Sequence, residues 1–142
     1  MLAINIVLLI LVIHYYRKSK RCTFTKLLNK TQFNYDTKHR MRRKDDMIIL
    51  IDIDKFKQIN DAFGHAHGDR VIEHVSKTIR SNIRFTDKAY RIGGDEFAIL
   101  TDDCSIAQRI KDKLIEVPVS MGCGKTYEEA DAHMYKCKKD VK

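Results

Sequence analysis

The sequence predicts an α+β fold in which a single sheet is covered by helices. Hydrophobic periodicity indicates a strand, two helices, a hairpin, a helix, a strand and a final helix along the chain. The continuous apolar run at 47–53 is typical of a central strand buried on both faces. Gly93 and Gly94 lie between two strand-like segments, which indicates a tight hairpin turn with both glycines free to take a positive φ.

Length and composition are those of one globular domain. The chain has 142 residues, of which 44% are hydrophobic and 32% charged, and a single proline. This length allows a real core but leaves no room for an additional folded sensor domain. The cysteines show no C-x-x-C pair, so we expect reduced thiols rather than a zinc knuckle or a disulfide framework; they are Cys22, Cys104, Cys123 and Cys137.

The positive charge is concentrated near the N-terminus. The formal net charge is +8, yet residues 17–44 contain eleven Lys and Arg against Asp36 alone, so the rest of the chain is slightly acidic. A basic run that follows an apolar segment fits an anionic membrane surface better than a nucleic-acid groove. We therefore expect a membrane partner and no nucleic acid.

The N-terminal segment predicts a membrane anchor. Residues 2–13 are apolar apart from Asn5, and a helix of about fifteen residues would span roughly 22 Å of a hydrocarbon core of roughly 30 Å. We predict an uncleaved single-pass anchor with its juxtamembrane segment at 1–21, and a cytoplasmic domain at 22–142. An interfacial or buried helix is the alternative. A secretory signal is disfavoured because a basic start and a small-residue cleavage site are missing.

Apolar spacing places the elements before the hairpin. A short amphipathic helix is expected at 23–33, followed by basic polar sequence and the strand at 47–53. A helix at 55–63 would turn Phe56, Ile59 and Phe63 toward the core. After a loop at 64–69, a longer helix would run from its capping residue Asp69 to about Ile83.

Three further elements follow the hairpin. The first is a helix that buries Ile106, Ile110 and Leu114. A strand at 117–122 comes next, in which Pro118 indicates a sheet edge or a strand start. The spacing of Thr126 and Glu129 is that of a capping box, which would open the last helix.

Two of the predicted strand ends carry acidic side chains. Asp52 and Asp54 close the strand at 47–53, while Asp95 and Glu96 follow the hairpin turn. A solvated hairpin tip would explain the second pair alone. Acidic ends on two neighbouring strands favour a divalent cation site instead.

Four spaced motifs resemble the GGDEF family of diguanylate cyclases; they are the runs 52–69, 91–97, 120–122 and 130–138. Residues 24–30 are similar to the motif that opens the family's domain, so the resemblance covers about residues 22–142. It implies a palm or ferredoxin-like antiparallel sheet of the nucleotidyl-cyclase type. It also implies a homodimer that condenses two GTP to cyclic di-GMP and pyrophosphate.

The resemblance further implies a metal site and a triphosphate site. Two Mg²⁺ ions, or Mn²⁺, would be held by Asp52, the carbonyl of Ile53, Asp95 and Glu96 for attack of a 3′-hydroxyl on an α-phosphate. The implied catalytic residues are Asp95, Glu96 and Lys57. Glu96 either completes the metal site or accepts the hydroxyl proton. Phe56 and Lys57 would bind the triphosphate at the start of a helix.

The base and the outer phosphates have implied contacts as well. Asn60 and Asp69 match the family's guanine-contacting residues, since an amide and a carboxylate complement guanine's acceptor and donors. His65 matches a position near the nucleotide or simply braces its loop, and a zinc site formed by His65, His67 and Asp69 is disfavoured for want of further ligands. Phosphate-contacting positions are matched by Lys138 and by Lys142, where the family usually has arginine.

Arg84 and Asp87 match the family's R-x-x-D product-inhibition site, although residues at i, i+3 can also pair with each other. Two departures from the family stand out. Cys22 and Lys26 replace an Asp and a Gly of the opening motif, and the stretch 98–119 is short, which implies loss of an accessory β-hairpin and some helix with the catalytic sheet kept. Two alternatives stay open: an impaired module that binds GTP or cyclic di-GMP, and a palm resembling CRISPR-type polymerases that makes a different cyclic nucleotide.

Overall fold

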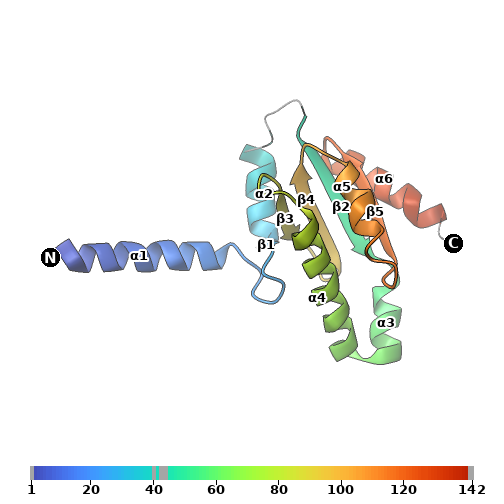
Figure 1. Cartoon of the computed structure of the whole chain (residues 1–142), viewed down its shortest axis with the longest axis horizontal. Coiled ribbons are helices and arrows are strands. Elements are labelled where there is room, and N and C mark those ends of the chain that lie inside the picture. The colour runs from blue at the N-terminus through green and yellow to red at the C-terminus, as the bar shows by residue number, and fades with distance from the viewer. Residues whose placement is uncertain (1, 40, 42–44, 141–142) are drawn as a thin grey trace.

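The computed structural model describes residues 2–39, 41 and 45–140, and it has the expected α+β architecture (Figure 1). The helices are α1 (Leu2–Ser19), α2 (Lys30–His39), α3 (Phe56–Phe63), α4 (His65–Asn82), α5 (Ser105–Lys111) and α6 (Tyr127–Asp140). The strands are β1 (Leu28–Asn29), β2 (Met47–Ile53), β3 (Lys88–Arg91), β4 (Glu96–Thr101) and β5 (Val119–Gly124). From β2 onward, the elements follow the order predicted from the sequence.

The five strands form one mixed sheet in the order β1-β3-β4-β2-β5. Three of the pairings are antiparallel, but β1 runs parallel to β3. The expectation of a purely antiparallel sheet is therefore wrong at this edge. β1 could not be predicted, because a two-residue strand is too short to produce an alternating pattern.

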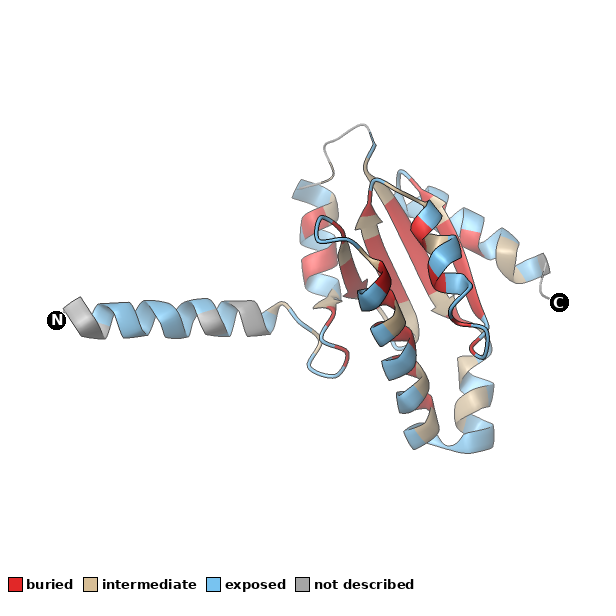
Figure 2. Cartoon of the chain, in the orientation of Figure 1, coloured by how far each residue is buried: buried red, intermediate tan, exposed pale blue. Residues whose placement is uncertain are grey.

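Helices cover both faces of the sheet, and β2 is buried on both. Ile49, Ile51 and Ile53 pack with α4 and α5 in one core cluster. Ile48 and Leu50 point the other way and pack with α2 and α6. Figure 2 shows the result as buried strands between helices whose outer surfaces are exposed. The continuous apolar run at 47–53 thus has the structural role predicted for it.

The predicted helix at 23–33 is wrong in its boundaries. Lys26 adopts a left-handed conformation with φ 63°, which a continuing helix cannot contain. Its N–H donates to the Cys22 carbonyl at 2.9 Å, so the chain turns here. The helix begins only at Lys30, where the Asn29 side chain accepts the Gln32 N–H at 3.0 Å and caps it.

The predicted loop at 64–69 is wrong in its length, because only Gly64 lies between the two helices. Gly64, with φ +81°, separates α3 from α4. Asp69 therefore lies inside α4 and does not cap it. Phe56 and Ile59 pack against the core as expected, but Phe63 is 68% exposed.

The C-terminal third follows the prediction more closely. Ile106, Ile110 and Leu114 are buried, although α5 ends before the last of them. Pro118 directly precedes β5, an edge strand that begins two residues later than predicted. At the start of α6, the Thr126 hydroxyl accepts the Glu129 N–H at 3.2 Å, as the capping box requires.

Cys104 and Cys123 form a disulfide, with their Cα atoms 6.2 Å apart. The expectation of reduced thiols is therefore wrong for this pair, while Cys22 and Cys137 are free. A separation of 19 residues carries no cue in the sequence, because the two cysteines meet only when α5 folds against β5.

α1 lies apart from the sheet (Figure 1), and its apolar side chains from Ile6 to Ile13 are 43% to 59% exposed. None of the described helices is long and apolar enough to cross a membrane. The 18 residues of α1 form a helix about 27 Å long, which is shorter than a hydrocarbon core of roughly 30 Å. The last three of these residues, Arg17, Lys18 and Ser19, are polar. The predicted single-pass anchor and membrane localisation are therefore wrong.

Gly122 is the point of closest approach between β5 and α6. A Cβ at this position would collide with the Ala130 carbonyl oxygen and the Met134 nitrogen, which are backbone atoms of α6. We expect Gly122→Ala to lower the free energy of unfolding by about 2 kcal/mol, measured by urea denaturation. Gly94→Ala is the matched control, because a Cβ there meets nothing within 4 Å. Equal stability of the two variants would contradict this close packing.

Candidate active site

The pairing of β2 with β4 brings the two acidic strand ends together. Asp52 lies directly opposite Glu96, so both side chains leave the same face of the sheet. The Ile53 N–H donates to the Asp95 carbonyl at 3.2 Å, which continues the pairing past the strand end. Asp52, Asp95 and Glu96 therefore share one end of the sheet, next to the start of α3.

Asp52 sits in an unfavourable electrostatic environment. Burial raises the pKa of its carboxyl, and the charges of Asp95 and Asp54 raise it further, whereas Lys138 opposes the shift. Lys138, from α6, forms an ion pair with Asp52 at 2.8 Å. A cation beside this carboxylate is thus already part of the structure.

Ser120 and Asp54 form a contact that the sequence analysis did not anticipate. The Ser120 hydroxyl, buried in β5, donates to Asp54 Oδ1 at 2.6 Å. β5 pairs with β2 so that Ser120 lies opposite Asp52. In the sequence, the signal for this contact was Ser120 itself, as part of the 120–122 motif. Its hydrogen bond fixes the orientation of the Asp54 carboxylate.

The two hairpin glycines do not have the predicted conformation. Neither adopts the left-handed φ expected for the turn. At Gly93 the constraint is space, because a Cβ there would meet the Glu96 carboxylate and force that side chain to move. The N–H groups of Ile92 and Gly93 both donate to the Glu96 carbonyl, at 3.0 and 3.2 Å. The turn is therefore closed around the backbone and side chain of Glu96.

Arg91 links this turn to the opening motif, a role that sequence reasoning missed. Its guanidinium donates to the Gly94 carbonyl at 2.6 Å, lies 5.5 Å from the Phe24 ring and approaches Cys22 Sγ at 3.8 Å. Burial raises the pKa of the Cys22 thiol, but hydrogen bonds from Thr25 and Arg91 outweigh it and lower the pKa to about 7. Cys22, which replaces an Asp of the opening motif, therefore loses its proton more readily than an ordinary cysteine, next to the positive charge of Arg91.

The start of α3 follows Asp54 immediately. Lys55 takes a left-handed conformation with φ 55°, which turns the chain sharply into the helix. Phe56 and Lys57 occupy the first turn, and Lys57 is exposed. The amides of this turn and the Lys57 ammonium are suited to bind phosphate next to the acidic strand ends.

Asn60 lies where α3 and α4 meet. Its Oδ1 is buried and has no hydrogen-bond partner among the described residues. The amide packs against Gly68 of α4, at a site that any larger residue would fill. A buried acceptor without a partner is costly, and an N–H donor placed at this corner would satisfy it. Asp69 follows Gly68 and is exposed.

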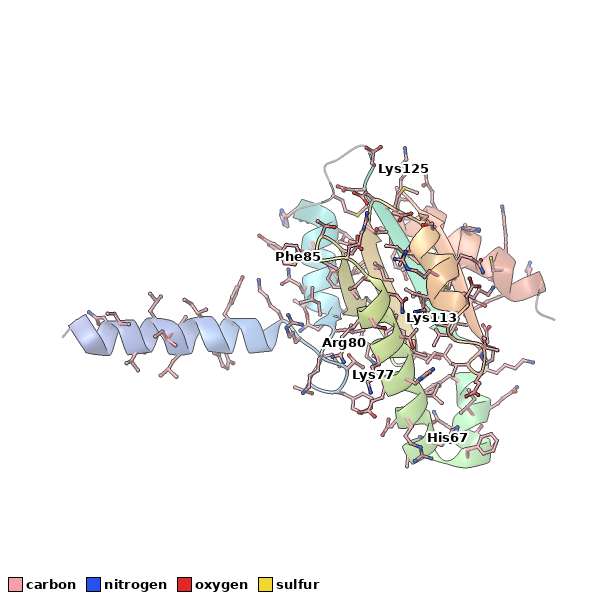
Figure 3. All side chains as sticks on the ribbon, in the orientation of Figure 1. His67, Lys77, Arg80, Phe85, Lys113 and Lys125 are labelled. Atoms are coloured by element: carbon pink, nitrogen blue, oxygen red, sulfur yellow. A yellow bond between two sulfur atoms is a disulfide. The ribbon has the colours of Figure 1, made fainter. Side chains whose placement is uncertain are left out.

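The histidines of α4 show no zinc site. His65 opens the helix and is exposed, and His67 lies 5.0 Å from the Phe63 ring and 3.3 Å from the Arg70 guanidinium. Figure 3 places His67 at the end of the molecule formed by α3 and the start of α4. In the described part of the chain, no three His, Cys, Asp or Glu side chains are grouped as ligands of one metal ion.

The remaining candidate residues are separate from this end of the sheet or outside the structure. Arg84 and Asp87 form an ion pair at 3.0 Å near the start of β3. Burial raises the pKa of the Asp87 carboxyl, but the hydrogen bonds that Arg84 donates to it keep this pKa below the ordinary value for Asp. Lys142 lies outside the described residues.

The family model described as diguanylate cyclase, GGDEF domain, matches residues 21–121. The chain belongs to the GGDEF family. The description of this family names its activity, diguanylate cyclase, and GGDEF diguanylate cyclases in general use GTP and divalent metal ions and make cyclic di-GMP. The five-stranded sheet and its helices are those of a GGDEF domain.

Two curated proteins illustrate the relationship. The chain is 37% identical over 112 residues to the uncharacterised protein YhcK of Bacillus subtilis, covering 70% of this chain and 31% of YhcK. It is 38% identical over 101 residues to the diguanylate cyclase DosC of Escherichia coli, covering 63% of this chain and 22% of DosC. The chain thus spans about a third or less of these relatives.

A solved structure shows the same fold. The crystal structure of the coiled coil and GGDEF domain of DgcB from Caulobacter crescentus, in complex with c-di-GMP, superposes with a TM-score of 0.84. The match covers 97% of this chain and 90% of that chain, at 23% identity.

Proposed function

We propose that this GGDEF domain is a diguanylate cyclase, which condenses two GTP into cyclic di-GMP and releases two pyrophosphates. The observation that carries the proposal is the pairing of β2 with β4, which supplies Asp52, Asp95 and Glu96 to one end of the sheet. The carboxylates and the Ile53 carbonyl are oxygen donors, which fit Mg²⁺ or Mn²⁺. Such an ion would neutralise charge on the phosphates during attack by the 3′-hydroxyl.

The protein's own groups would bind and orient the nucleotide. Lys57 and the first-turn amides of α3 would bind the triphosphate. The Lys138 ammonium would exchange its ion pair with Asp52 for one with a phosphate. Asn60 and Asp69 would read guanine, for which the unpartnered Asn60 oxygen is a suitable acceptor. Glu96 would complete the metal site or accept the hydroxyl proton. Because each domain would hold one GTP, two copies must face each other.

The test is to incubate the purified chain with Mg²⁺ and each nucleoside triphosphate and to identify products by mass. Conversion of GTP to cyclic di-GMP alone supports the proposal. A product that contains adenine would favour the alternative in which the domain resembles a CRISPR-type polymerase palm and makes a different cyclic nucleotide. Binding of GTP without turnover would favour an impaired module.

Gly68→Ala provides a sharper test of the guanine site. The new methyl group would occupy the space of the Asn60 amide, so we expect GTP affinity to fall about tenfold, with a smaller preference for GTP over ATP. Isothermal titration calorimetry with both nucleotides measures this. Ala66→Ser, at an exposed position of the same helix, should bind as the wild type does. Unchanged GTP selectivity in Gly68→Ala would count against guanine reading at this corner.

A further inference from the structure

Arg84 is bound by two carboxylates, those of Asp87 just before β3 and Asp102 just after β4. Its Nε and Nη2 donate to Asp87 at 3.2 and 3.0 Å. The same Nη2 also binds Asp102 and, at 3.2 Å, the Thr101 hydroxyl. The Asp87 side chain is buried, whereas those of Arg84 and Asp102 are 45% and 52% exposed.

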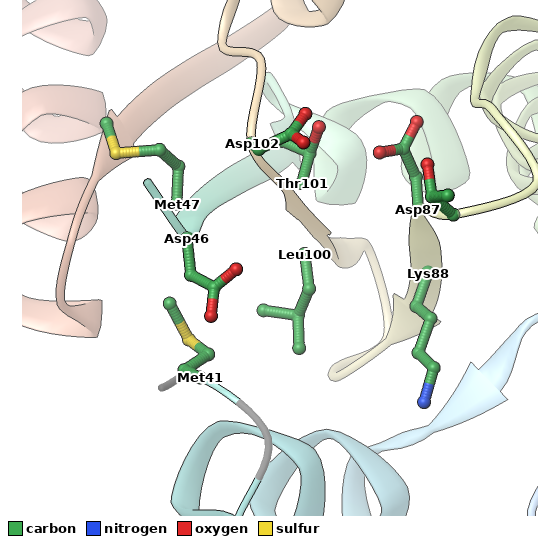
Figure 4. A pocket seen from close by; sticks show the side chains of 9 residues that line it. Met41, Asp46, Met47, Asp87, Lys88, Leu100, Thr101 and Asp102 are labelled. Carbon is green, nitrogen blue, oxygen red and sulfur yellow. The ribbon is translucent and has the colours of Figure 1, made fainter. Parts of the chain in front are cut away.

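This cluster lies far from the candidate active site. In the β2–β4 register, Met47 is opposite Thr101 at one end of the sheet, and Asp52 is opposite Glu96 at the other. The five intervening residue steps correspond to about 17 Å. A pocket of about 410 Å³ opens beside the cluster. Figure 4 shows Asp102 and Thr101 on one side of this pocket and Asp87 and Lys88 on another.

We infer that Asp102 withholds Arg84 from anionic ligands and thereby sets a low affinity of the R-x-x-D pair for cyclic di-GMP. This inference rests on the proposed function, which makes cyclic di-GMP the product. Asp87 is buried and binds Arg84 through a fork of two nitrogens, so it stays in place. A phosphodiester or a guanine acceptor must therefore compete with Asp102 for the exposed side of the guanidinium. Exchange of one anionic acceptor for another yields little net binding energy.

Titration of synthetic cyclic di-GMP into the purified protein tests the inference. Asp102→Asn keeps the shape of the side chain but removes its charge, so we expect affinity to rise about tenfold over the wild type. Asp103→Asn is the matched control, because Asp103 accepts the Ser105 N–H at 2.9 Å and does not bind Arg84. Its affinity should remain within about twofold of the wild type.

The double variant Arg84→Ala with Asp102→Asn should lose the gained affinity. Circular dichroism melts of each variant establish that it is folded, and Asp102→Ser serves as a second, smaller replacement. The inference is overturned if neither Asp102 variant binds more tightly than the wild type, including the case in which none of them binds. It is also overturned if the gain survives without Arg84. Since the ligand is supplied, failure of the wild type to convert GTP is a separate result that bears only on the proposed function.

Discussion

Asp95→Ala is expected to reduce cyclic di-GMP formation by about a thousandfold or more while leaving the fold intact. The proposed metal site would lose one of its carboxylates, and metal-assisted phosphoryl transfer depends on several kcal/mol of charge stabilisation. The fold should survive because the Asp95 side chain makes no hydrogen bond or ion pair with a described residue. Its carbonyl, which accepts the Ile53 N–H, is unchanged by the substitution.

Initial rates of product formation, followed by chromatography, measure this effect, and a thermal melt measures the fold. Asp112→Ala is the control, since among the described residues this exposed carboxylate at the end of α5 binds only the Gln108 side chain, at 2.7 Å. It should retain wild-type activity. Wild-type rates in Asp95→Ala would refute the metal assignment, and an unfolded variant would refute the view that Asp95 contributes little to stability.

Most of the sheet could be predicted because its signals are local. The apolar run at 47–53 and the glycine pair at 93–94 each fix a strand or a turn through their own neighbours. Periodicity also found the buried stripe of Ile106, Ile110 and Leu114. The prediction that Asp52 and Asp95 lie at one end of the sheet needed one further assumption, that the strand that ends near Asp52 lies beside the strand that begins near Asp95.

The features that were missed depend on long-range contacts or on unusual backbone conformations. The Cys104–Cys123 disulfide exists only because α5 folds against β5. Lys26 adopts a left-handed conformation at a position where a glycine would have indicated a turn. Lysine normally favours a helix, so the sequence does not reveal the turn. The sequence predicts that Gly93 is needed for a positive φ, whereas in the structure the position has little room for a Cβ because the Glu96 side chain lies against it. Packing of this kind leaves no periodic trace in a sequence.

Another missed feature is the buried carboxylate of Asp36, which binds α2 to β3. Asp36 is fully buried, and its Oδ2 accepts hydrogen bonds from the Tyr90 hydroxyl at 2.7 Å and the Lys88 ammonium at 3.0 Å. Its Oδ1 accepts the Gln32 amide at 3.0 Å. In the sequence, Asp36 was only the single acid in a basic run. Two of its partners, Lys88 and Tyr90, lie more than fifty residues away on β3.

Asp36→Ala is expected to lower the free energy of unfolding by about 3 kcal/mol at pH 7. The substitution removes the acceptor of the hydrogen bonds from Gln32, Lys88 and the fully buried Tyr90. Lys88 is 30% exposed and can turn to solvent, which keeps the loss below that of a fully buried ion pair. Urea denaturation measures the difference. Asp61→Ala, at an exposed position of α3, should change stability by less than about 0.5 kcal/mol.

The pH dependence of this difference distinguishes the charge of Asp36 from its bulk. Burial alone would raise the pKa of Asp36, but the hydrogen bonds from Tyr90, Lys88 and Gln32 hold it below the ordinary value. A depressed folded-state pKa means that the stabilisation is complete above the unfolded value of about 3.9 and is lost as the pH falls through the folded pKa. The stability gap between wild type and Asp36→Ala should therefore narrow on acidification below about pH 4. A gap that stays constant there would mean that Asp36 stabilises the fold through packing and neutral hydrogen bonds, without its charge.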